Sequence, residues 1–270
     1  MHPFLFEIFG KKIASYGVLA VLGAFVAWAI VWLLAGKKNA EFSLAFLISI
    51  CGAIVGSMAL RPIMKLPGII INWEHYRRMT VEMFLSYTFG EIVFYGGLIG
   101  GLVSLSLYCA RFKLPILPFT DAFAPALALA HGIGRVGCFL AGCCYGVHVS
   151  SGHPFAVVYP LISQSAPAGV PLLAVQLIEA ASLLALSALL ILVYKKSRRT
   201  GLCTCIYILL YSIMRFILEF YRGDAVRGVY GPFSTSQYIS MAMFLAVIVL
   251  VGTLRNKTSI RWLFGPPSSS

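Results

Sequence analysis

LALAHGIGRVGCFLAGCCYG, residues 127–146, decides the fold because it holds a cation, Arg135, inside a long apolar run. A second arginine, Arg215, stands in the same situation within LLYSIMRFILEFYRG, residues 209–223. A charged side chain at the centre of a bilayer costs about 3 kcal/mol on insertion scales, so it usually faces a polar interior and marks a functional site. Two guanidiniums that meet inside one helix bundle predict a buried anion, and lipid phosphate is the anion abundant at that depth.

The composition is that of a polytopic membrane protein and excludes an ordinary soluble globule. The chain has 270 residues, of which 60% are hydrophobic and 11% are charged, and its mean hydropathy is +0.89. At roughly 20 residues per span, an all-α chain of this length holds about seven transmembrane helices with short loops. The net charge of +12 does not predict nucleic-acid binding, because Lys and Arg gather in the cytoplasmic loops of membrane proteins.

The apolar runs predict the spans and their direction. We expect transmembrane helices at 13–35, 43–60, 89–110, 120–144, 171–194, 202–221 and 234–254. The segment 61–88 mixes Trp, Tyr, Phe, Arg and Glu, which suits a helix lying in the membrane interface. With the two deep arginines set aside and the N-terminus outside, the inside loops hold eleven basic residues and the outside segments eight. This bias, with KKSRR at 195–199 as its strongest part, predicts an N-out, C-in protein.

The same pattern predicts a simple domain organisation. Residues 1–254 are expected to form a single transmembrane catalytic domain, without an internal repeat. Residues 255–270 are expected to form a cytoplasmic tail, whose polar end GPPSSS suits a disordered segment.

Glycines recur four residues apart at Gly96–Gly100, Gly97–Gly101 and Gly142–Gly146. Small residues at this spacing let helices approach each other closely. Bare backbone amides also let a phosphate approach. Packing and phosphate binding therefore stay equal alternatives for these glycines.

Two ionisable clusters lie on single helical faces. Arg215, Glu219 and Arg222 are spaced i, i+4 and i+7, so they share one face. They form either an ion-pair ladder at the membrane edge or, because Arg215 is deeper, part of an anion site. His131 precedes Arg135 by four residues and is either a hydrogen-bonded packing residue or a neutral imidazole that accepts a proton.

The remaining acidic residues of interest are expected to have structural roles. Glu179 follows Gln176 by about one turn, and its carboxylate can bond that amide or pair with an arginine of another helix. We favour the structural role for Glu179. Glu91 and Asp121 lie near span ends, where solvated or capping roles are typical.

Seven cysteines raise the question of a metal site or a disulfide. Cys138, Cys143 and Cys144 have the spacing C-x4-C-C, which is not typical of zinc. Such cysteines usually act as small buried hydrophobic residues, and we expect no metal and no cofactor. If the fourth span ends outside, Cys143 and Cys144 face an oxidising compartment, where a disulfide or a reactive thiol is the alternative.

Tyr16 and Tyr95 each precede a glycine within an apolar run. Membrane tyrosines commonly belong to the aromatic belt at an interface. Neither tyrosine stands at an obvious span end, so a phenol hydrogen bond to a phosphate or carbonyl is the alternative.

Six segments, in order along the chain, carry a resemblance to a known family. They are YG at 16–17, FYGGLIGG at 94–101, HGIGRVGCFLAGCCYG at 131–146, QLIEA at 176–180, YSIMRFILEFYRG at 211–223 and STSQYIS at 234–240. Together they resemble the bacterial prolipoprotein diacylglyceryl transferase family, whose signature is G-R-x-G-N-F-x-N-x-E-x-x-G. The resemblance implies an enzyme of the inner membrane that moves a diacylglyceryl group from phosphatidylglycerol to the lipobox cysteine of a prolipoprotein. The implied products are a thioether and sn-glycerol 1-phosphate.

The resemblance also implies roles for single residues. Arg135 and Arg215 match the two arginines held to be essential in the family, Tyr16 matches its first-span tyrosine, and Glu219 matches the carboxylate after the second arginine. The chain departs from the family pattern at several positions. Tyr95 replaces a histidine often proposed as a base, and two cysteines replace the asparagine and glutamate of the signature, at Cys138 and Cys143.

The chemistry of the implied reaction agrees with these residues. A thiolate must attack a glycerol carbon, so a base or a positive field is needed, and the arginine fork suits the departing phosphate. The expected catalytic residues are Arg135, Arg215, Tyr95, His131 and Glu219, with Tyr95, His131 or an unassigned group as the base. The expected substrate-binding residues are Tyr16, Gly96, Gly97, Gly134, Arg135, Cys138, Cys143, Gly146 and Arg222.

The expected partners are phosphatidylglycerol, prolipoprotein signal peptides with a lipobox cysteine, and the bilayer of the bacterial inner membrane, but not nucleic acid. One alternative is a membrane transporter of an anionic solute, although no inverted repeat supports it. Another is a catalytically divergent paralogue that binds lipid or lipoprotein, which the replacements at Tyr95 and Cys143 favour.

Overall fold

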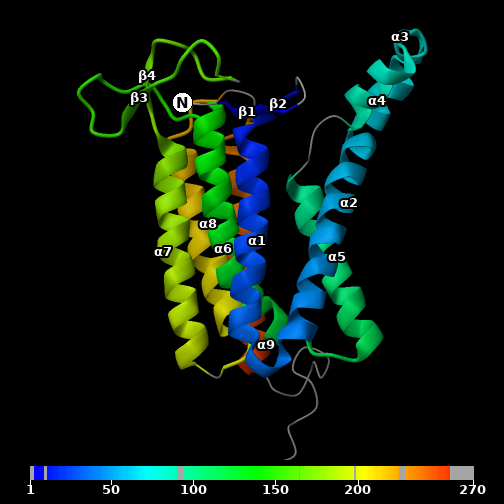
Figure 1. Ribbon diagram of the computed structural model, residues 1–270, viewed down its shortest axis with the longest axis vertical. Coiled ribbons are helices and arrows are strands. Elements are labelled where there is room, and N and C mark those ends of the chain that lie inside the picture. The colour runs from blue at the N-terminus through cyan, green and yellow to red at the C-terminus, as the bar shows by residue number, and fades with distance from the viewer. Residues whose placement is uncertain are drawn as a thin grey trace, which may run out of the picture. The chain divides into compact units, whose positions relative to one another are not determined.

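The computed structural model describes residues 3–8, 11–89, 94–163, 165–197, 199–224 and 229–255. Long helices dominate these residues (Figure 1): α1 (Ser15–Ala35), α2 (Asn39–Ile71), α5 (Phe94–Phe112), α6 (Ile116–Ala141), α7 (Val175–Lys196), α8 (Leu202–Glu219) and α9 (Thr235–Arg255). A 3-10 turn, Gly36–Lys38, joins α1 to α2, and two short helices follow α2: α3 (Trp73–Tyr76) and α4 (Val81–Phe89).

Three short antiparallel strand pairs accompany the helices. They are β1 (Phe4–Ile8) with β2 (Lys11–Ala14), β3 (Ala156–Val158) with β4 (Pro171–Leu173), and β5 (Val229–Tyr230) with β6 (Phe233–Ser234). The expectation of an all-α chain thus holds for the spans, while the connections form small hairpins. β4 also explains why α7 begins at Val175 and not at the predicted residue 171.

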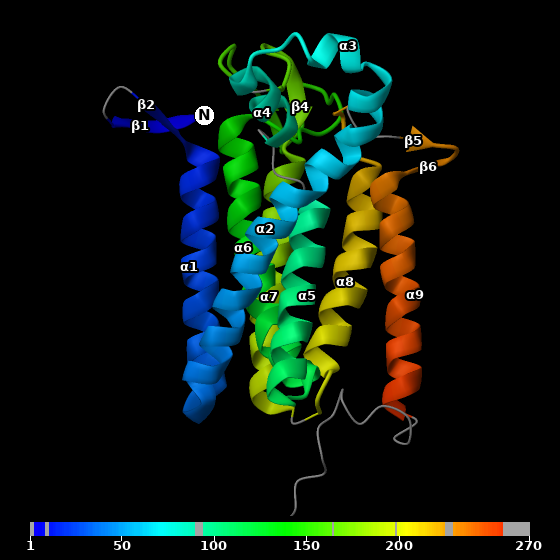
Figure 2. The same ribbon diagram turned by 90° about the vertical axis from the view of Figure 1, so that its right-hand side faces the viewer.

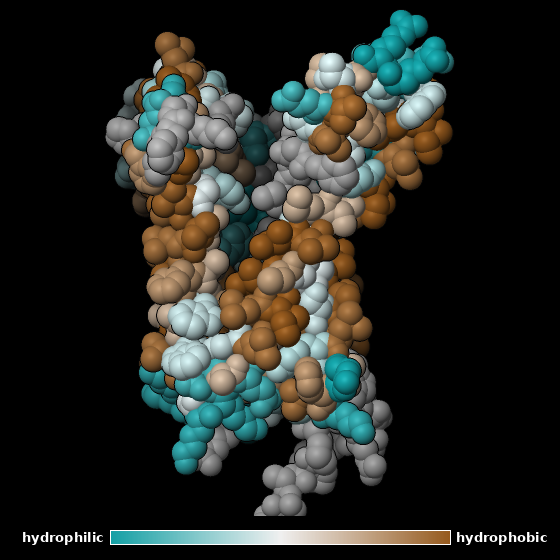
Figure 3. All heavy atoms as spheres, turned by 45° about the vertical axis from the view of Figure 1, so that its right-hand side comes forward, coloured by the Kyte–Doolittle hydropathy of each residue, from teal (hydrophilic) through white to brown (hydrophobic). Residues whose placement is uncertain are grey.

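The protein is a polytopic membrane protein. Among the described residues, five segments are long and apolar enough to cross a membrane, and the first of them joins α1 and α2. Figure 3 shows hydrophobic side chains over the middle of the long helices and hydrophilic ones near their ends. Helices suit this setting because they satisfy every backbone hydrogen bond within the segment. The number of seven spans and the N-out direction stay predictions.

The segment 61–88 differs from its expected form as one interfacial helix. Its first eleven residues continue α2 to Ile71, and the remainder forms the short α3 and α4. Pro62 and Pro67 lie inside α2, and membrane helices tolerate proline where neighbouring groups satisfy the freed backbone. Arg61 is buried, and its Nε donates to the carbonyl of Tyr87 at 3.0 Å, which holds the end of α2 against α4.

The helices group into two compact units, which are described separately. The first unit contains α1 and α6 to α9 with the strand pairs, and the second contains α2 to α5. The single catalytic domain at 1–254 stays a prediction.

In the second unit, glycines let α2 and α5 pack backbone to backbone. A Cβ added at Gly96 would meet the carbonyl oxygen of Gly56, and one at Gly100 would meet that of Gly52. A Cβ at Gly97 would lie 3.4 Å from the carbonyl oxygen of Ala53. The packing role of these glycines is therefore present in the structure, whereas a role in substrate binding stays a prediction.

In the first unit, α6 and α8 end where α1, α7 and α9 begin (Figures 1 and 2). Hydrogen bonds at two helix starts fix this arrangement. The Asp121 carboxylate of α6 accepts from the backbone N–H groups of Gly201 and Thr204, so it caps α8 across helices. Ser234 and Gln237 form a reciprocal capping box at the start of α9. The capping role expected for Asp121 is confirmed, and Glu91 lies outside the described residues.

Two glycines, which carry no side chain, let α6 pack closely against α1 and α7. A Cβ at Gly132 would lie 3.3 Å from the carbonyl oxygen of Ala180 in α7. A Cβ at Gly137 would lie 3.3 Å from the Cα of Tyr16 in α1. These approaches place the last two turns of α6 between the first turns of α1 and α7, which is where the ionisable residues of the first unit gather.

Candidate active site

The first ion pair joins α6 to α7. Arg135 Nη2 lies 3.1 Å from Oε1 of Glu179, whose side chain is only 1% exposed. Arg135 Nε donates to Nε2 of His131 at 3.3 Å, and the same His131 nitrogen lies 3.9 Å from Glu179 Oε1. Arg135 therefore contacts both the carboxylate and the imidazole, and the ion pair is expected because a buried charge must be paired.

The second ion pair lies within α8 and reaches α9. Arg215 Nη2 lies 2.7 Å from Glu219 Oε2, one turn along the helix, and donates to Ser236 Oγ at 3.2 Å. Both charged side chains are less than a tenth exposed. Arg215 Nη1 is buried and makes no hydrogen bond to any residue that the structure describes. A buried donor of this kind is costly unless a ligand satisfies it.

His131 lies within electrostatic reach of both arginines. The positive charges of Arg135 and Arg215 both act on it. The His131 ring also lies 5.4 Å from the ring of Tyr211, which stands one turn before Arg215 on α8. The meeting of the two guanidiniums on one ligand stays a prediction.

A third arginine lies just beyond α8. Arg222 makes two hydrogen bonds of 3.0 Å to the carboxylate of Asp224, and its Nη1 is buried without a hydrogen bond to a described residue. A backbone bridge pairs Arg222 with Gly146. A Cβ at Gly146 would lie 2.5 Å from the carbonyl oxygen of Leu173, so only glycine fits this crossing of chain segments.

Three thiols lie beside these arginines, where α6 ends. The Sγ atoms of Cys138, Cys143 and Cys144 all lie within 4.8 Å of one another. Hydrogen bonds from the other two thiols lower the pKa of the Cys144 thiol below its ordinary value. The positive charges of Arg222 and Arg135 act in the same direction. The cluster therefore favours an ionised sulfur next to the arginines.

The backbone turns sharply to bring these thiols together. Gly142 and Cys144 have φ angles of 72° and 59°. The left-handed region costs a residue with a Cβ about 1–2 kcal/mol, so the conformation of Cys144 is strained. Gln176, which is fully buried, holds the turn by donating to the carbonyl of Cys143 at 2.7 Å and to the hydroxyl of Tyr159 at 2.8 Å.

The other expected site residues fall into two groups. Tyr16 stands in the first turn of α1 and is half exposed, and a Cβ at Gly134 would meet no atom within 4 Å. Both belong to the unit that contains the arginines. Tyr95, Gly96 and Gly97 stand on α5 in the second unit, and their part in the site stays a prediction.

Sequence analysis gave Glu179 two alternatives, a bond to the amide of Gln176 or an ion pair with an arginine of another helix, and the structure shows the ion pair with Arg135. The reason is that a carboxylate in an apolar helix needs a cationic partner, and two arginines were available. The contacts of Asp224 and Ser236 were missed, since they depend on how the chain after α8 and the start of α9 fold back.

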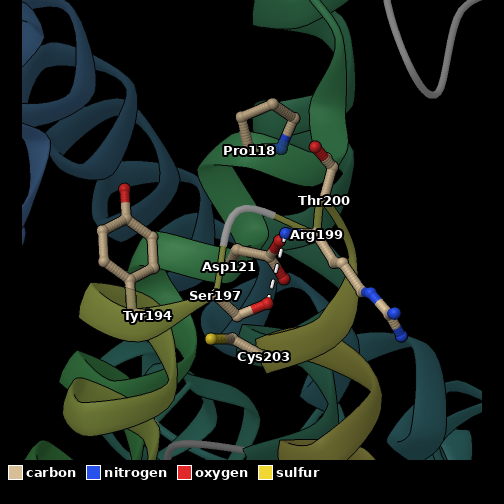
Figure 4. A pocket seen from close by; sticks show the side chains of 7 residues that line it. All are labelled: Pro118, Asp121, Tyr194, Ser197, Arg199, Thr200 and Cys203. Carbon is tan, nitrogen blue, oxygen red and sulfur yellow. Dashed lines mark hydrogen bonds between the residues drawn. The ribbon is translucent and has the colours of Figure 1, made fainter.

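A cavity of about 270 Å³ lies at the other end of the first unit. Its lining, drawn in Figure 4, consists of Pro118, Asp121, Tyr194, Ser197, Arg199, Thr200 and Cys203. The backbone N–H of Arg199 donates to Ser197 Oγ at 3.2 Å, and Asp121 is occupied in capping α8. This cavity contains none of the expected catalytic or substrate-binding residues, so we do not assign it to the site.

Comparison with known proteins identifies the family. A family model described as prolipoprotein diacylglyceryl transferase matches residues 3–253. The phosphatidylglycerol–prolipoprotein diacylglyceryl transferase 2 of Clostridium perfringens is 35% identical over 254 residues, covering 93% of this chain and 94% of that protein. The corresponding transferase of Clostridium tetani is 35% identical over 245 residues, covering 89% and 93%, and that of Finegoldia magna is 29% identical over 254 residues, covering 93% and 94%. The chain, with its two buried arginines at one end of a helix bundle, therefore belongs to the prolipoprotein diacylglyceryl transferase family.

Proposed function

We propose that the protein transfers an sn-1,2-diacylglyceryl group from phosphatidylglycerol to the lipobox cysteine of prolipoproteins, at the bacterial inner membrane. Family membership over nearly the whole chain supports diacylglyceryl transfer as the reaction. The products are a thioether on the cysteine and sn-glycerol 1-phosphate. The observation that supports the residue roles is that Arg135 and Arg215, both within apolar helices, are each held by a carboxylate, Glu179 or Glu219.

Arg135 and Arg215 hold the lipid phosphate in this proposal. A guanidinium has five N–H donors, and each of these arginines uses one edge on its own carboxylate, Glu179 or Glu219. The carboxylates fix the side chains, and the remaining donors can bind phosphate oxygens. The buried Nη1 of Arg215, which bonds to no described residue, supports such a ligand.

The arginines also serve the reaction itself. As the thiolate sulfur attacks the glycerol carbon, the bond from that carbon to the phosphate oxygen breaks and negative charge grows on the departing phosphate. Donors already aimed at that charge in a buried site stabilise the transition state more than the ground state. Each such donor is typically worth a factor of about 10²–10³ in rate.

We propose His131 as the acceptor of the thiol proton. Its Nε2 accepts from Arg135 Nε in this structure, so it takes the thiol proton once that guanidinium turns its Nε–H to the lipid phosphate. Glu179, 3.9 Å from this nitrogen, then stabilises the imidazolium that forms. Tyr95 is the other expected base. Tyr95 stands on α5 in the second unit, and the second prediction below tests both residues.

The test uses purified full-length protein in phosphatidylglycerol micelles with a synthetic lipobox peptide, and mass spectrometry detects the added diacylglyceryl group. Arg135→Lys and Arg215→Lys keep the charge but remove the planar fork, so each is expected to reduce the rate at least 100-fold. Arg199→Lys, at the far end of the first unit, is the matched control and should keep the wild-type rate.

Two results would overturn parts of this proposal. Near-wild-type rates in both arginine variants would remove the phosphate clamp. Peptide that stays unmodified with the wild-type protein would instead favour a divergent paralogue that binds lipid without transferring it.

A further inference from the structure

Three thiols of the first unit lie close enough together to hold a metal ion. Among the described residues, Cys138, Cys143 and Cys144 form the one group of three metal-ligating side chains whose ligand atoms lie within 4.8 Å of one another. Zinc–sulfur bonds of about 2.3 Å place the sulfurs of a zinc site roughly 3.8 Å apart, so small side-chain movements suffice. The unusual spacing C-x4-C-C works here because the chain turns back at Gly142 and Cys144.

The chemistry of the ligands selects the kind of ion. Three cysteine sulfurs are soft donors, which suit Zn²⁺ and similar thiophilic ions and not Mg²⁺ or Ca²⁺. Within the described chain, no histidine or carboxylate joins the group as a fourth ligand. Structural zinc sites have four protein ligands, whereas catalytic sites have three and leave one position for a water or a substrate.

We propose that Cys138, Cys143 and Cys144 bind a Zn²⁺-like ion whose fourth position takes the substrate's cysteine thiol. This inference rests on the proposed function, because the lipobox cysteine of that function is the thiol that would fill the position. A bound thiol is deprotonated by a thiophilic metal, and the metal then supplies the activation that a protein base would otherwise provide.

The place of the cluster fits this role. Cys138 follows Arg135 by one turn of α6, and the charge of Arg135 acts on both Cys138 and Cys144. An ion at the thiols therefore lies next to the guanidinium that holds the phosphate in the proposed function. The activated sulfur would then meet the glycerol carbon that it attacks between the ion and the Arg135 guanidinium, as displacement requires.

The step balances without any change of oxidation state. The substrate thiol gives its proton to His131 as the sulfur binds the ion. The sulfur then forms a bond to the glycerol carbon, the bond from that carbon to the phosphate oxygen breaks, and the electron pair leaves with the phosphate. The thioether product carries no charge and binds the ion more weakly than the thiolate, so it can depart.

Cobalt provides a direct test, because Co²⁺ bound by thiolates absorbs visible light. Full-length protein purified with a reductant is titrated with Co²⁺. Wild-type protein is expected to bind one Co²⁺ ion per chain and to show the absorption band of sulfur-to-cobalt charge transfer. The triple variant Cys138→Ala/Cys143→Ala/Cys144→Ala is expected to lose the band, whereas Cys51→Ala/Cys205→Ala, which leaves the cluster intact, should keep it. Circular dichroism confirms that each variant stays helical.

A peptide titration then tests the open position. Adding the lipobox peptide to the cobalt form is expected to intensify the sulfur band, and a peptide with serine in place of the cysteine should leave it unchanged. Wild-type protein that binds no Co²⁺, a triple variant that binds it equally well, or a disulfide between two of these cysteines in the native protein would each overturn the metal site.

Activity separates this inference from the proposed function. Transfer is expected to fall at least tenfold when a chelator removes the metal and to return with Zn²⁺. Undiminished transfer by verified metal-free protein would overturn the role of the ion and leave the transferase function standing. Metal-loaded protein that never forms the thioether would overturn the transferase function, and the thiol step with it, while the Co²⁺ titration alone would decide the ion site.

Discussion

At the scale of single residues, the site consists of charges that hold one another in place. Arg135, Arg215 and Arg222 each pair with a carboxylate, and two of them keep a buried Nη1 that bonds to no described residue. Buried ion pairs add little net stability, because both charges lose their hydration. Their value here is orientation, since a fixed guanidinium presents its remaining N–H groups in one direction.

The first prediction concerns Glu179, whose carboxylate pairs with Arg135. Glu179→Gln keeps the size of the side chain but leaves a buried cation without its carboxylate, which costs about 3–5 kcal/mol. We expect a lower thermal midpoint and at least a tenfold loss of transfer to the peptide. Glu74→Gln is the control, because Glu74 pairs with Arg77 where both side chains are more than half exposed, and such pairs contribute about 0–1 kcal/mol. Equal effects of the two substitutions would contradict the central place of Glu179.

The second prediction decides between the two expected bases. Removal of a positioned general base typically lowers the rate by a factor of about 10²–10⁴. We expect His131→Gln to reduce the transfer rate at saturating substrate by at least 100-fold and Tyr95→Phe to reduce it by less than tenfold. The rate of thioether formation is measured by mass spectrometry over a range of pH. The reverse order of effects would assign the base to Tyr95.

At the scale of helices, close packing sets where the site residues stand. In the second unit, α2 and α5 approach so closely that added side chains at the paired glycines would meet backbone carbonyls. In the first unit, Gly132 and Gly137 bring α7 and α1 against α6. The positions of Glu179 and Tyr16 beside the last turns of α6 follow from these contacts.

The third prediction tests the packing role of the glycines on α5. A Cβ at Gly96 meets the Gly56 carbonyl, which cannot move aside as a flexible side chain would, so we expect Gly96→Ala to lower the thermal midpoint by several degrees. Gly68→Ala on α2 is the control, because a Cβ there meets nothing within 4 Å and alanine favours the helix. An unchanged midpoint with lost transfer in Gly96→Ala would favour the predicted substrate role instead.

Much of the helical pattern was predictable from apolar runs. The expected spans at 13–35, 202–221 and 234–254 lie within two residues of α1, α8 and α9 at each end. The second span was cut too short at residue 60, because Arg61 and Pro62 are signals that usually end a helix. The structure overrides them, since the Arg61 guanidinium finds a carbonyl partner in α4.

The candidate site was predictable only in part. The depth of Arg135 and Arg215 in apolar sequence was enough to predict that each has polar partners, because a charge at bilayer depth must face a polar interior and not the lipid. The contact of Glu179 with Arg135 depends on the register between α6 and α7, which periodicity does not determine. The thiol cluster depends on the left-handed backbone at Cys144, a conformation that its side chain disfavours and that no local pattern signals.

At the scale of the whole molecule, the direction of the chain across the membrane decides which side the thiols and arginines face. The ends of α7 and α9 lie at the end of the first unit away from the arginines (Figure 2), and α7 ends in Lys195 and Lys196. Basic residues at a helix end favour the cytoplasmic side. The candidate site therefore belongs to the outer half of the membrane in the predicted N-out, C-in protein.

The last prediction tests this direction with reporter fusions in bacterial cells. Green fluorescent protein folds to its fluorescent form in the cytoplasm and alkaline phosphatase becomes active outside it, because its disulfides form only there. We expect fusions after Lys196 and after Arg255 to fluoresce with inactive phosphatase, and a fusion after Ser151, in the loop that follows α6, to show the opposite. Fusions that report Ser151 inside would place the arginines and thiols toward the cytoplasm. The substrate cysteine would then have to reach the site from that side, and the phosphate clamp would keep its geometry but face the other leaflet.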